Sequence, residues 1–318
     1  MQAVLNAAFP LFALIFTGYL CGRFGVFSRV ATNILNRFAV YLALPALMFS
    51  AMAKFTPGGG AGESPGQAGQ LGFSLAFAGG IATTFALGFA LSRWRGNRPA
   101  DASIEGLDAS YSNVGFMGIP LCLLVFGPAA LPAAVVATLF TACVLFLCGV
   151  VLIEMDLRRG AGLGRTAGRV LLSLLRNPLL VAPAAGLAMA LTGLPVPAPV
   201  DRFAGLLGGA ASPCALVCIG LFLAQERVSL GDAPMIGVLV GLKLLVQPAV
   251  TAALALFVFG VPPAWSHPAV LLASLPIGSG PFAIAKLYGL KAGVTSGAIL
   301  VSHLASAVTV SALIAWLA

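Results

Sequence analysis

Charged residues are scarce in this sequence. Only 8% of its 318 residues are Asp, Glu, Lys or Arg, whereas 60% are hydrophobic. An average soluble domain has about 25% charged and about 45–50% apolar residues. This composition argues against a soluble enzyme, a nucleic-acid binder, a disordered tail or a disulfide scaffold. Together with a mean hydropathy of +1.04, it indicates a polytopic membrane protein.

Motifs for catalysis and for cofactors are also missing. The sequence has no Walker loop for ATP and no H-E-x-x-H metal motif. An intramembrane serine hydrolase using Ser279 and His303 is disfavoured, because Gly278-Ser279-Gly280 lacks the G-x-S-G spacing. The six cysteines all lie in apolar runs, which favours reduced core thiols over disulfides or zinc. We therefore expect a protein that is not an enzyme and has no cofactor, no metal and no nucleic-acid partner.

Long apolar runs predict the membrane spans. A helix needs about 20 mostly apolar residues to cross the hydrocarbon core. Pairs of glycines four residues apart, at Gly18 and Gly22, Gly205 and Gly209, and Gly293 and Gly297, predict close helix contacts. We predict an all-α protein with ten spans, over 3–22, 31–53, 70–92, 104–126, 129–153, 177–193, 201–224, 234–260, 266–286 and 292–316.

The basic residues predict the orientation of these spans. If the N-terminus lies outside, fourteen of the 17 lysines and arginines fall in inside segments, and only Lys54 and Arg202 lie outside. Because cytoplasmic loops carry the excess of Lys and Arg, both termini are expected outside, which is the periplasm for an inner-membrane protein. The 13 arginines against four lysines, in a chain rich in Ala and Gly, are compatible with a GC-rich bacterium and hence an inner membrane.

The spans divide into two sets of five around a basic connection. We predict a first repeat over 1–153, a basic cytoplasmic linker over 154–176 and a second repeat over 177–318. An odd number of spans in each half forces the halves into opposite orientations, so a repeat must be inverted. Weak sequence similarities between the halves support such a repeat, since Pro120 is followed by Gly127 in the fourth span and Pro281 by Gly289 in the ninth.

Two segments break the helical pattern at matching places in the halves. They are the run from Ser110 to Pro120 and the run from Ser274 to Pro281, each with glycines beside a proline. Glycine loosens the backbone and proline readily starts a new helix, whose first amides favour an anion. Such breaks are tolerated in a membrane only inside protein or beside a watery cavity. The candidate substrate-binding residues are Ser112, Asn113, Gly118, Pro120, Ser279, Gly280 and Pro281.

The run Ser112-Asn113-Val114-Gly115-Phe116-Met117-Gly118-Ile119-Pro120-Leu121 resembles the fourth-span signature of the auxin efflux carrier family. Arg176-Asn177-Pro178 and the segment from Lys243 to Pro248 are similar to its pattern as well. That family includes plant auxin exporters and bacterial carriers of malonate and related acids. The resemblance implies two inverted five-helix repeats, with the fourth and ninth helices broken and crossing at their prolines. It also implies a substrate site at Asn113, Pro120 and Pro281, and a homodimer.

Three ionisable residues within the spans are candidates for charge balance or coupling, since burying them is expensive. Lys243 either reaches back to the cytoplasmic surface or is a cation inside the bundle. Asp108 follows Asp101 and Glu105 on one helix face, which is either a solvated collar or the start of an ion site that could pair with Lys243. His303 is either a packed core residue or a proton-binding group.

The predicted function is secondary active transport of small organic anions by alternating access, with the substrate at the crossing of the broken helices. The sequence places no carboxylate near that crossing, which suits an anionic substrate. The expected partners are a small carboxylate and the lipid bilayer, with H+ or Na+ as the coupling ion. The alternatives are a sodium- or proton-coupled antiporter, a bile-acid-type sodium symporter, and a receptor or scaffold without transport.

Overall fold

The computed structural model describes residues 2–54, 67–157, 178–193, 195–225 and 232–317. Within these ranges every regular element is a helix, and extended pairing is limited to one isolated bridge. The all-helical class is as predicted. Most of the predicted basic linker, 154–176, lies outside the described residues.

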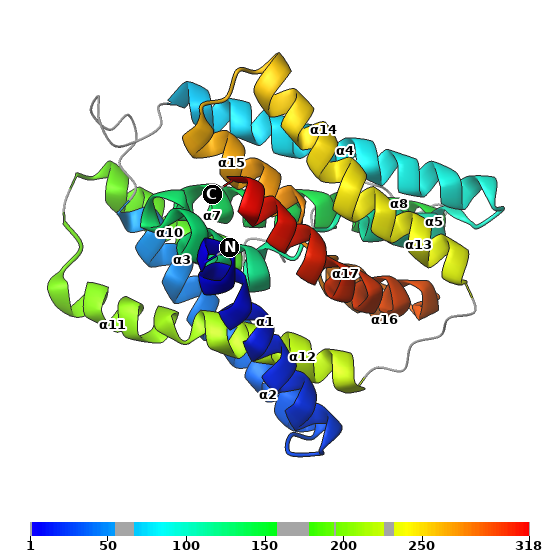
Figure 1. The fold of residues 1–318 in the computed structure, drawn as a ribbon, viewed down its shortest axis with the longest axis horizontal. Coiled ribbons are helices and arrows are strands. Elements are labelled where there is room, and N and C mark those ends of the chain that lie inside the picture. The colour runs from blue at the N-terminus through cyan, green and yellow to red at the C-terminus, as the bar shows by residue number, and fades with distance from the viewer. Residues whose placement is uncertain (1, 55–66, 158–177, 194, 226–231, 318) are drawn as a thin grey trace.

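Figure 1 shows the order of the helices along the chain. The first half contains α1 (Gln2–Arg23), α2 (Arg29–Phe38), η1 (Ala39–Ala43), α3 (Leu44–Ala53), α4 (Gln67–Trp94), α5 (Pro99–Ser110), η2 (Val114–Gly118), α6 (Ile119–Phe126), η3 (Pro128–Ala130), α7 (Leu131–Leu139), η4 (Phe140–Leu145) and α8 (Phe146–Leu157). The second half contains α10 (Pro178–Leu191), α11 (Ala198–Gly209), α12 (Ala211–Gln225), α13 (Ala233–Gly241), η5 (Leu242–Val246), α14 (Gln247–Ala253), η6 (Leu254–Val258), α15 (Pro263–Ala273), α16 (Gly280–Leu287) and α17 (Gly293–Leu317).

Six helices among the described residues are long and apolar enough to cross a membrane. Shorter apolar helices include Phe12–Arg23, Val114–Phe126 and Pro178–Leu191. Each of the ten predicted ranges contains helical residues. Because only six of the described helices are long and apolar enough to cross a membrane, the number of ten spans stays a prediction. The long helices are Arg29–Ala53, Gly69–Trp94, Pro128–Leu157, Ala198–Gln225, Ala233–Val258 and Gly293–Leu317.

Prolines inside the long helices are accommodated by wide turns. The π-helical segments η1, η2 and η5 each end two residues before a proline, namely Pro45, Pro120 and Pro248. A proline lacks the amide N–H, and its ring clashes with the carbonyl four residues earlier. A π turn spaces the backbone more widely at this point. The helices therefore continue through these prolines.

The helices form two groups that pack mainly within themselves. One group contains α1, α2, α3, α10, α11 and α12; the other contains α4 to α8 and α13 to α17. Figure 1 shows α4 beside the α13–α14 segment on one side of the molecule and the α1, α2 and α12 helices on the other. The broken segments belong to the second group and face the first, so they lie at the boundary between the two groups of helices.

Glycines produce the closest helix contact, between α1 and α12. A Cβ on Gly18 would collide with the backbone of Val217, and one on Gly220 would lie 2.5 Å from the Tyr19 nitrogen. Small residues drive such approaches in lipid, where apolar burial alone gains little. The predicted contact at Gly18 and Gly22 is thus confirmed. Gly205 and Gly209 make no close helix contact within the described chain, because a Cβ at either position would meet no atom within 4 Å.

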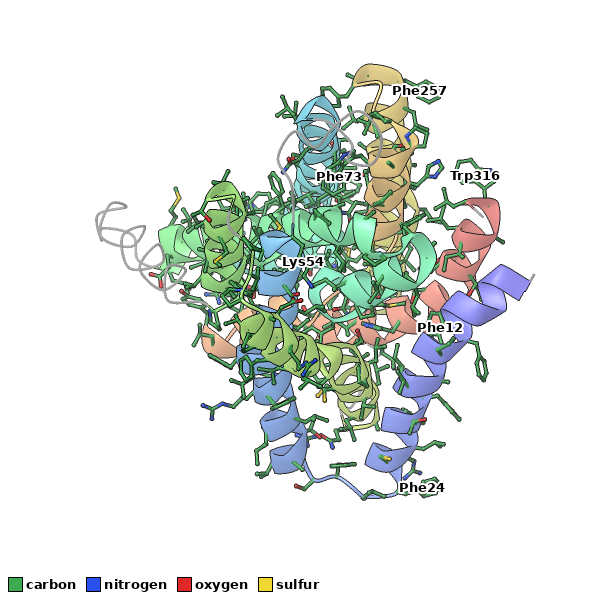
Figure 2. All side chains as sticks on the ribbon, turned by 90° about the vertical axis from the view of Figure 1, so that its left-hand side faces the viewer. Phe12, Phe24, Lys54, Phe73, Phe257 and Trp316 are labelled. Atoms are coloured by element: carbon green, nitrogen blue, oxygen red, sulfur yellow. The ribbon has the colours of Figure 1, made fainter. Side chains whose placement is uncertain are left out.

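The outer surface is apolar, as lipid requires. Phe257 and Trp316 project outward in Figure 2 and are 87% and 73% exposed, whereas Phe73 is completely buried. Phe24 lies at the tip of the α1–α2 turn in the same view. Lys54 at the end of α3 forms an ion pair of 2.7 Å with Asp201 in the first turn of α11. These features agree with a multi-pass membrane protein.

Candidate functional site

The two helix interruptions lie against each other and are joined by hydrogen bonds. The first separates α5 from η2, and the second separates α15 from α16. Ser112 and Ile277 form an antiparallel bridge. The backbone N–H of Asn113 donates a hydrogen bond of 2.9 Å to the Pro276 carbonyl, and the backbone N–H of Gly278 donates one of 2.9 Å to the Tyr111 carbonyl. Backbone groups freed by one break are thus satisfied by the other, which is the condition for such breaks in a membrane.

The crossing differs from the geometry that the family resemblance implies. It is centred on Ser112 and Ile277, not on Pro120 and Pro281. Pro281 is the second residue of α16 and does start the new helix. Pro120 does not, because the helix already begins at Val114 and widens ahead of the proline. Both prolines are buried.

Tyr111 explains the glycines of the second interruption. Its ring packs so closely that a Cβ on Gly278 would lie 3.0 Å from Cδ1, and one on Gly280 would lie 2.5 Å from Cζ. Any larger residue at either position would displace the ring and the paired backbone. Gly118 is likewise a packing residue, since its Cβ position is surrounded by the side chains of Leu272 and Leu275.

A cavity of about 310 Å³ lies next to the crossing, between the two helix groups. This volume is at the lower end of the range of about 300–1,000 Å³ found for small-molecule sites. No carboxylate contributes to its described lining. The first group supplies Thr32, Asn33, Asn36, Cys218, Ile219 and Phe222, and the second supplies Asn113, Phe116, Ser279, Phe282, Ala283, Lys286, Ile299 and His303.

One face of α16, together with Ser279 directly before it, forms a wall of this cavity. Ser279, Phe282, Ala283 and Lys286 stand at positions i, i+3, i+4 and i+7, so they lie on the same side of the helix. The Lys286 ammonium lies 5.2 Å from the centre of the Phe282 ring and is exposed. From the sequence alone, Lys286 is one of the fourteen basic residues expected on the inside and is not a candidate for the site. The i, i+3, i+4, i+7 spacing from Ser279 was the signal that would have assigned it to the site.

The fold brings three of the ten candidate site residues together in this cavity, namely Asn113, Ser279 and His303. Ser112 and Gly280 instead line a smaller cavity of about 130 Å³ beside the crossing, which Asn113 and Ser279 share. The hydroxyl of Ser112 is buried without a hydrogen-bond partner in the described part of the chain. Pro120, Pro281 and Gly118 line neither cavity.

Helix α17 is bonded to both interruptions through two adjacent residues. The Ser302 hydroxyl accepts a hydrogen bond of 3.1 Å from the Ile277 amide. The His303 ring contacts Asn113, with 3.2 Å between Nε2 and the Asn113 Nδ2. Ser302 and His303 both bond the Ile299 carbonyl on their own helix, at 2.9 and 2.8 Å. A shift of α17 would therefore move both broken helices.

The Lys243 side chain lies inside the bundle and does not reach the surface. Its side chain is completely buried, and Nζ donates a hydrogen bond of 2.7 Å to the carbonyl of Ala273. Ala273 is the last residue of α15, where the helix dipole is negative and the carbonyls have no partner within the helix. The ammonium thus caps α15 at the second interruption.

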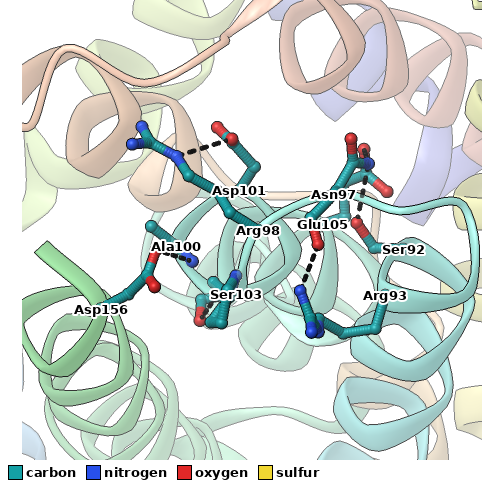
Figure 3. Close-up of polar contacts among 10 residues, drawn as sticks. Ser92, Arg93, Asn97, Arg98, Ala100, Asp101, Ser103, Glu105 and Asp156 are labelled. Carbon is teal, nitrogen blue, oxygen red and sulfur yellow. Dashed lines mark hydrogen bonds and ion pairs between the residues drawn. The ribbon is translucent and has the colours of Figure 1, made fainter.

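The three acidic residues on α5 have different surroundings. Figure 3 shows the collar at the start of the helix, where Asp101 pairs with Arg98 at 3.0 Å. Glu105 lies 3.8 Å from the Arg95 guanidinium. Asp108 is fully buried; its Oδ2 accepts from the Thr295 hydroxyl at 2.8 Å, and its Oδ1 has no hydrogen-bond partner among the described residues. The suggested Asp108–Lys243 pair is not among the ion pairs of the described chain.

Sequence comparison identifies the family to which this arrangement belongs. The model of the membrane transport protein family, which is the auxin efflux carrier family, matches residues 3–314. The chain belongs to this family. The family and the relatives found for the chain are transport proteins, so the geometry above belongs to a member of a transporter family.

Individual relatives agree with this assignment. The chain is 34% identical over 320 residues to a Rhizobium meliloti (strain 1021) protein named "Putative malonate transporter", with 99% of this chain and 96% of that protein covered. It is 31% identical over 132 residues to "Probable auxin efflux carrier component 1b" of Oryza sativa subsp. japonica, covering 40% of this chain and 24% of the rice protein. It is also 25% identical over 241 residues to an uncharacterized transporter of Methanothermobacter thermautotrophicus, covering 75% and 74%.

Proposed function

We propose that this protein is a secondary active transporter of small organic anions, with a dicarboxylate such as malonate as the first substrate to test. The observation that carries the proposal is the cavity at the paired interruptions, whose described lining has amides, hydroxyls and the Lys286 ammonium but no carboxylate. Such a lining offers hydrogen-bond donors and positive charge to an anion. The name of the Rhizobium meliloti relative supports the choice of malonate.

The proposed mechanism is alternating access by movement of one helix group against the other. The cavity has one wall in each group, so a relative rotation or sliding would open it on one side and close it on the other. In this proposal ten spans form two inverted repeats. The membrane is the bacterial inner membrane, and both termini lie in the periplasm. The cavity then opens to the cytoplasm, because Asn33 and Lys286 lie near helix ends that the basic residues assign to the inside.

Malonate binding to the purified protein tests the site. Asn113 is 5% exposed at the base of the cavity. A hydrogen bond to a charged group is worth about 1.5–3 kcal/mol, so Asn113→Ala should weaken binding about 10- to 100-fold. Lys286 is exposed, and an exposed ion pair is worth about 0.2–1 kcal/mol, so Lys286→Met should weaken binding up to about fivefold, less at high salt.

Lys291→Met is the matched control, because Lys291 is an exposed lysine five residues further on that does not line the cavity. It should bind malonate like the wild type. Wild-type affinity in Asn113→Ala, or equal losses in Lys286→Met and Lys291→Met, would contradict the proposed site. Binding is measured by calorimetry, and transport is measured by uptake into proteoliposomes. A folding defect is detected separately, as the loss of the monodisperse peak in size-exclusion chromatography.

The buried carboxyl of Asp108 favours a second candidate, a sodium- or proton-coupled antiporter or a bile-acid-type sodium symporter of related architecture. Its unpartnered Oδ1 is an available cation ligand or proton site. Currents from proteoliposomes after sodium or pH jumps, without any organic acid, would support the antiporter. A sodium-dependent current only with larger organic acids would support the symporter.

A further inference from the structure

The ring of His303 has a fixed tautomer. Its Nδ1 lies 2.8 Å from the Ile299 carbonyl oxygen, and its Nε2 lies 3.2 Å from the Asn113 Nδ2. A carbonyl oxygen can only accept, so Nδ1 carries the proton. In the neutral ring Nε2 is then an acceptor, and the Asn113 amide nitrogen is the donor to it. The ring is 6% exposed and is held by both contacts.

This arrangement orients the side-chain amide of Asn113 unfavourably for an anionic substrate. Since its nitrogen is directed at His303, the oxygen is the amide atom left for the cavity that Asn113 lines. That oxygen has no hydrogen-bond partner among the described residues. An amide oxygen facing a carboxylate is repulsive, because both groups are acceptors. While His303 is neutral, Asn113, the most buried amide of the cavity, therefore offers no hydrogen-bond donor to an anion.

Protonation of His303 would correct the orientation. Once Nε2 bears a proton, it must donate, and a half-turn of the Asn113 amide brings Oδ1 to it as the acceptor. The same half-turn presents the Asn113 Nδ2 to the cavity as a donor. We propose that His303 is the proton-binding group of this carrier, and that the site takes up one proton together with one carboxylate by reversing the Asn113 amide. The inference rests on the proposed function and adds the coupling ion to it.

The coupling between anion and proton is reciprocal. A bound carboxylate favours a positive charge on His303, and a protonated His303 favours the carboxylate, so each ligand raises the affinity for the other by the same factor. No titratable residue occurs on α13. The titratable residues on the elements packed against α17 are Tyr19, Cys21 and Arg23 on α1, Asp101, Glu105 and Asp108 on α5, Lys243 on η5, His267 on α15 and Lys286 on α16.

The pH dependence of malonate binding tests the proposal, and the second histidine of the chain supplies the control. His267 lies on α15 and does not line the cavity. In the wild type and in His267→Gln, affinity should rise about tenfold for each pH unit of acidification while the free imidazole is neutral. In His303→Gln this rise should be absent, leaving only the change due to malonate itself. Binding should take up one proton per malonate in the first two proteins and none in the third.

A spectroscopic measurement covers the case in which His303→Gln does not fold. In His267→Gln, with the affinity tag removed, His303 is the remaining histidine, and its ring ¹⁵N shifts report the protonation of each nitrogen. We expect a protonated Nδ1 and a bare Nε2 without malonate, and two protonated nitrogens with it. A bare Nε2 in the malonate complex, or unchanged pH dependence in His303→Gln, overturns the inference alone. Failure of the wild type to bind malonate at any pH overturns the proposed malonate site as well.

Discussion

Replacing Gly220 by alanine tests how closely α1 and α12 must approach. The new Cβ would lie 2.5 Å from the Tyr19 nitrogen and 2.9 Å from the Gly18 carbonyl carbon, whereas ordinary contact begins at 3.4 Å. All these atoms belong to the backbone, so no side chain can rotate away. The Ile15 carbonyl oxygen lies closer still, so the two helices must separate by more than the difference between 2.5 and 3.4 Å, which is 0.9 Å. A gap of about 0.5–1 Å forfeits roughly a quarter to a half of the dispersion energy of the contact.

The expected magnitude follows from these terms. Overpacking costs about 1–3 kcal/mol and more when backbone must move, while alanine gains about 1 kcal/mol in helix propensity. We expect Gly220→Ala to lower the free energy of unfolding by about 2 kcal/mol or more. Uptake should fall too, because Cys218, Ile219 and Phe222 on α12 line the cavity.

Gly205→Ala is the control, because a Cβ at this position of α11 meets no atom within 4 Å. It should leave stability unchanged or raise it by about 0.5–1 kcal/mol. Thermal unfolding in detergent, followed by tryptophan fluorescence and checked by denaturant titration in mixed micelles, compares the two variants. Equal stability of Gly220→Ala and Gly205→Ala would refute the close approach of α1 and α12.

Two further substitutions test how the interruptions are held. Lys243→Met removes the donor to the Ala273 carbonyl, which costs about 1–3 kcal/mol, but it also replaces a buried amine, which is costly to desolvate, by an apolar side chain of similar length. We therefore expect near wild-type thermal stability with about tenfold slower uptake, and unchanged uptake at every pH would show that the ammonium only fills space. Ser302→Ala leaves the Ile277 amide without its acceptor and should destabilise by about 1–3 kcal/mol. Ser306→Ala, equally buried on α17 but bonded only within its helix, should cost less, and equal losses would contradict a role at the crossing.

The pairing of the broken helices gives a physical reason for locating transport at this point. Each interruption would leave unsatisfied backbone groups in the membrane if it stood alone. The bridge between Ser112 and Ile277, together with the contacts from Ser302 and Lys243, satisfies several of them. The hydroxyl of Ser112, which has no hydrogen-bond partner among the described residues, belongs to a residue that lines the smaller cavity. A site built in this way has polar groups at membrane depth without requiring a permanent ion.

The sequence by itself determined the class of the protein and the places where its helices break. Hydropathy, proline and glycine act locally, so they predict where a helix forms and where it cannot continue. They identified Asn113 and Ser279 as candidates, and the family signature around Asn113 supported transport. The same local patterns misjudged Pro120, because a π turn lets the helix continue where a proline alone suggests a new start.

Only the tertiary structure decided which distant residues meet. Asn113 and His303 are 190 positions apart, and Asp108 and Thr295 are 187 apart. Their contacts depend on the crossing angles and rotations of whole helices, which no local pattern specifies. The same is true of Lys243, whose sequence position allowed both the surface and the core. Its hydrogen bond to Ala273 exists because η5 packs beside the end of α15, and that packing is a property of the assembled bundle.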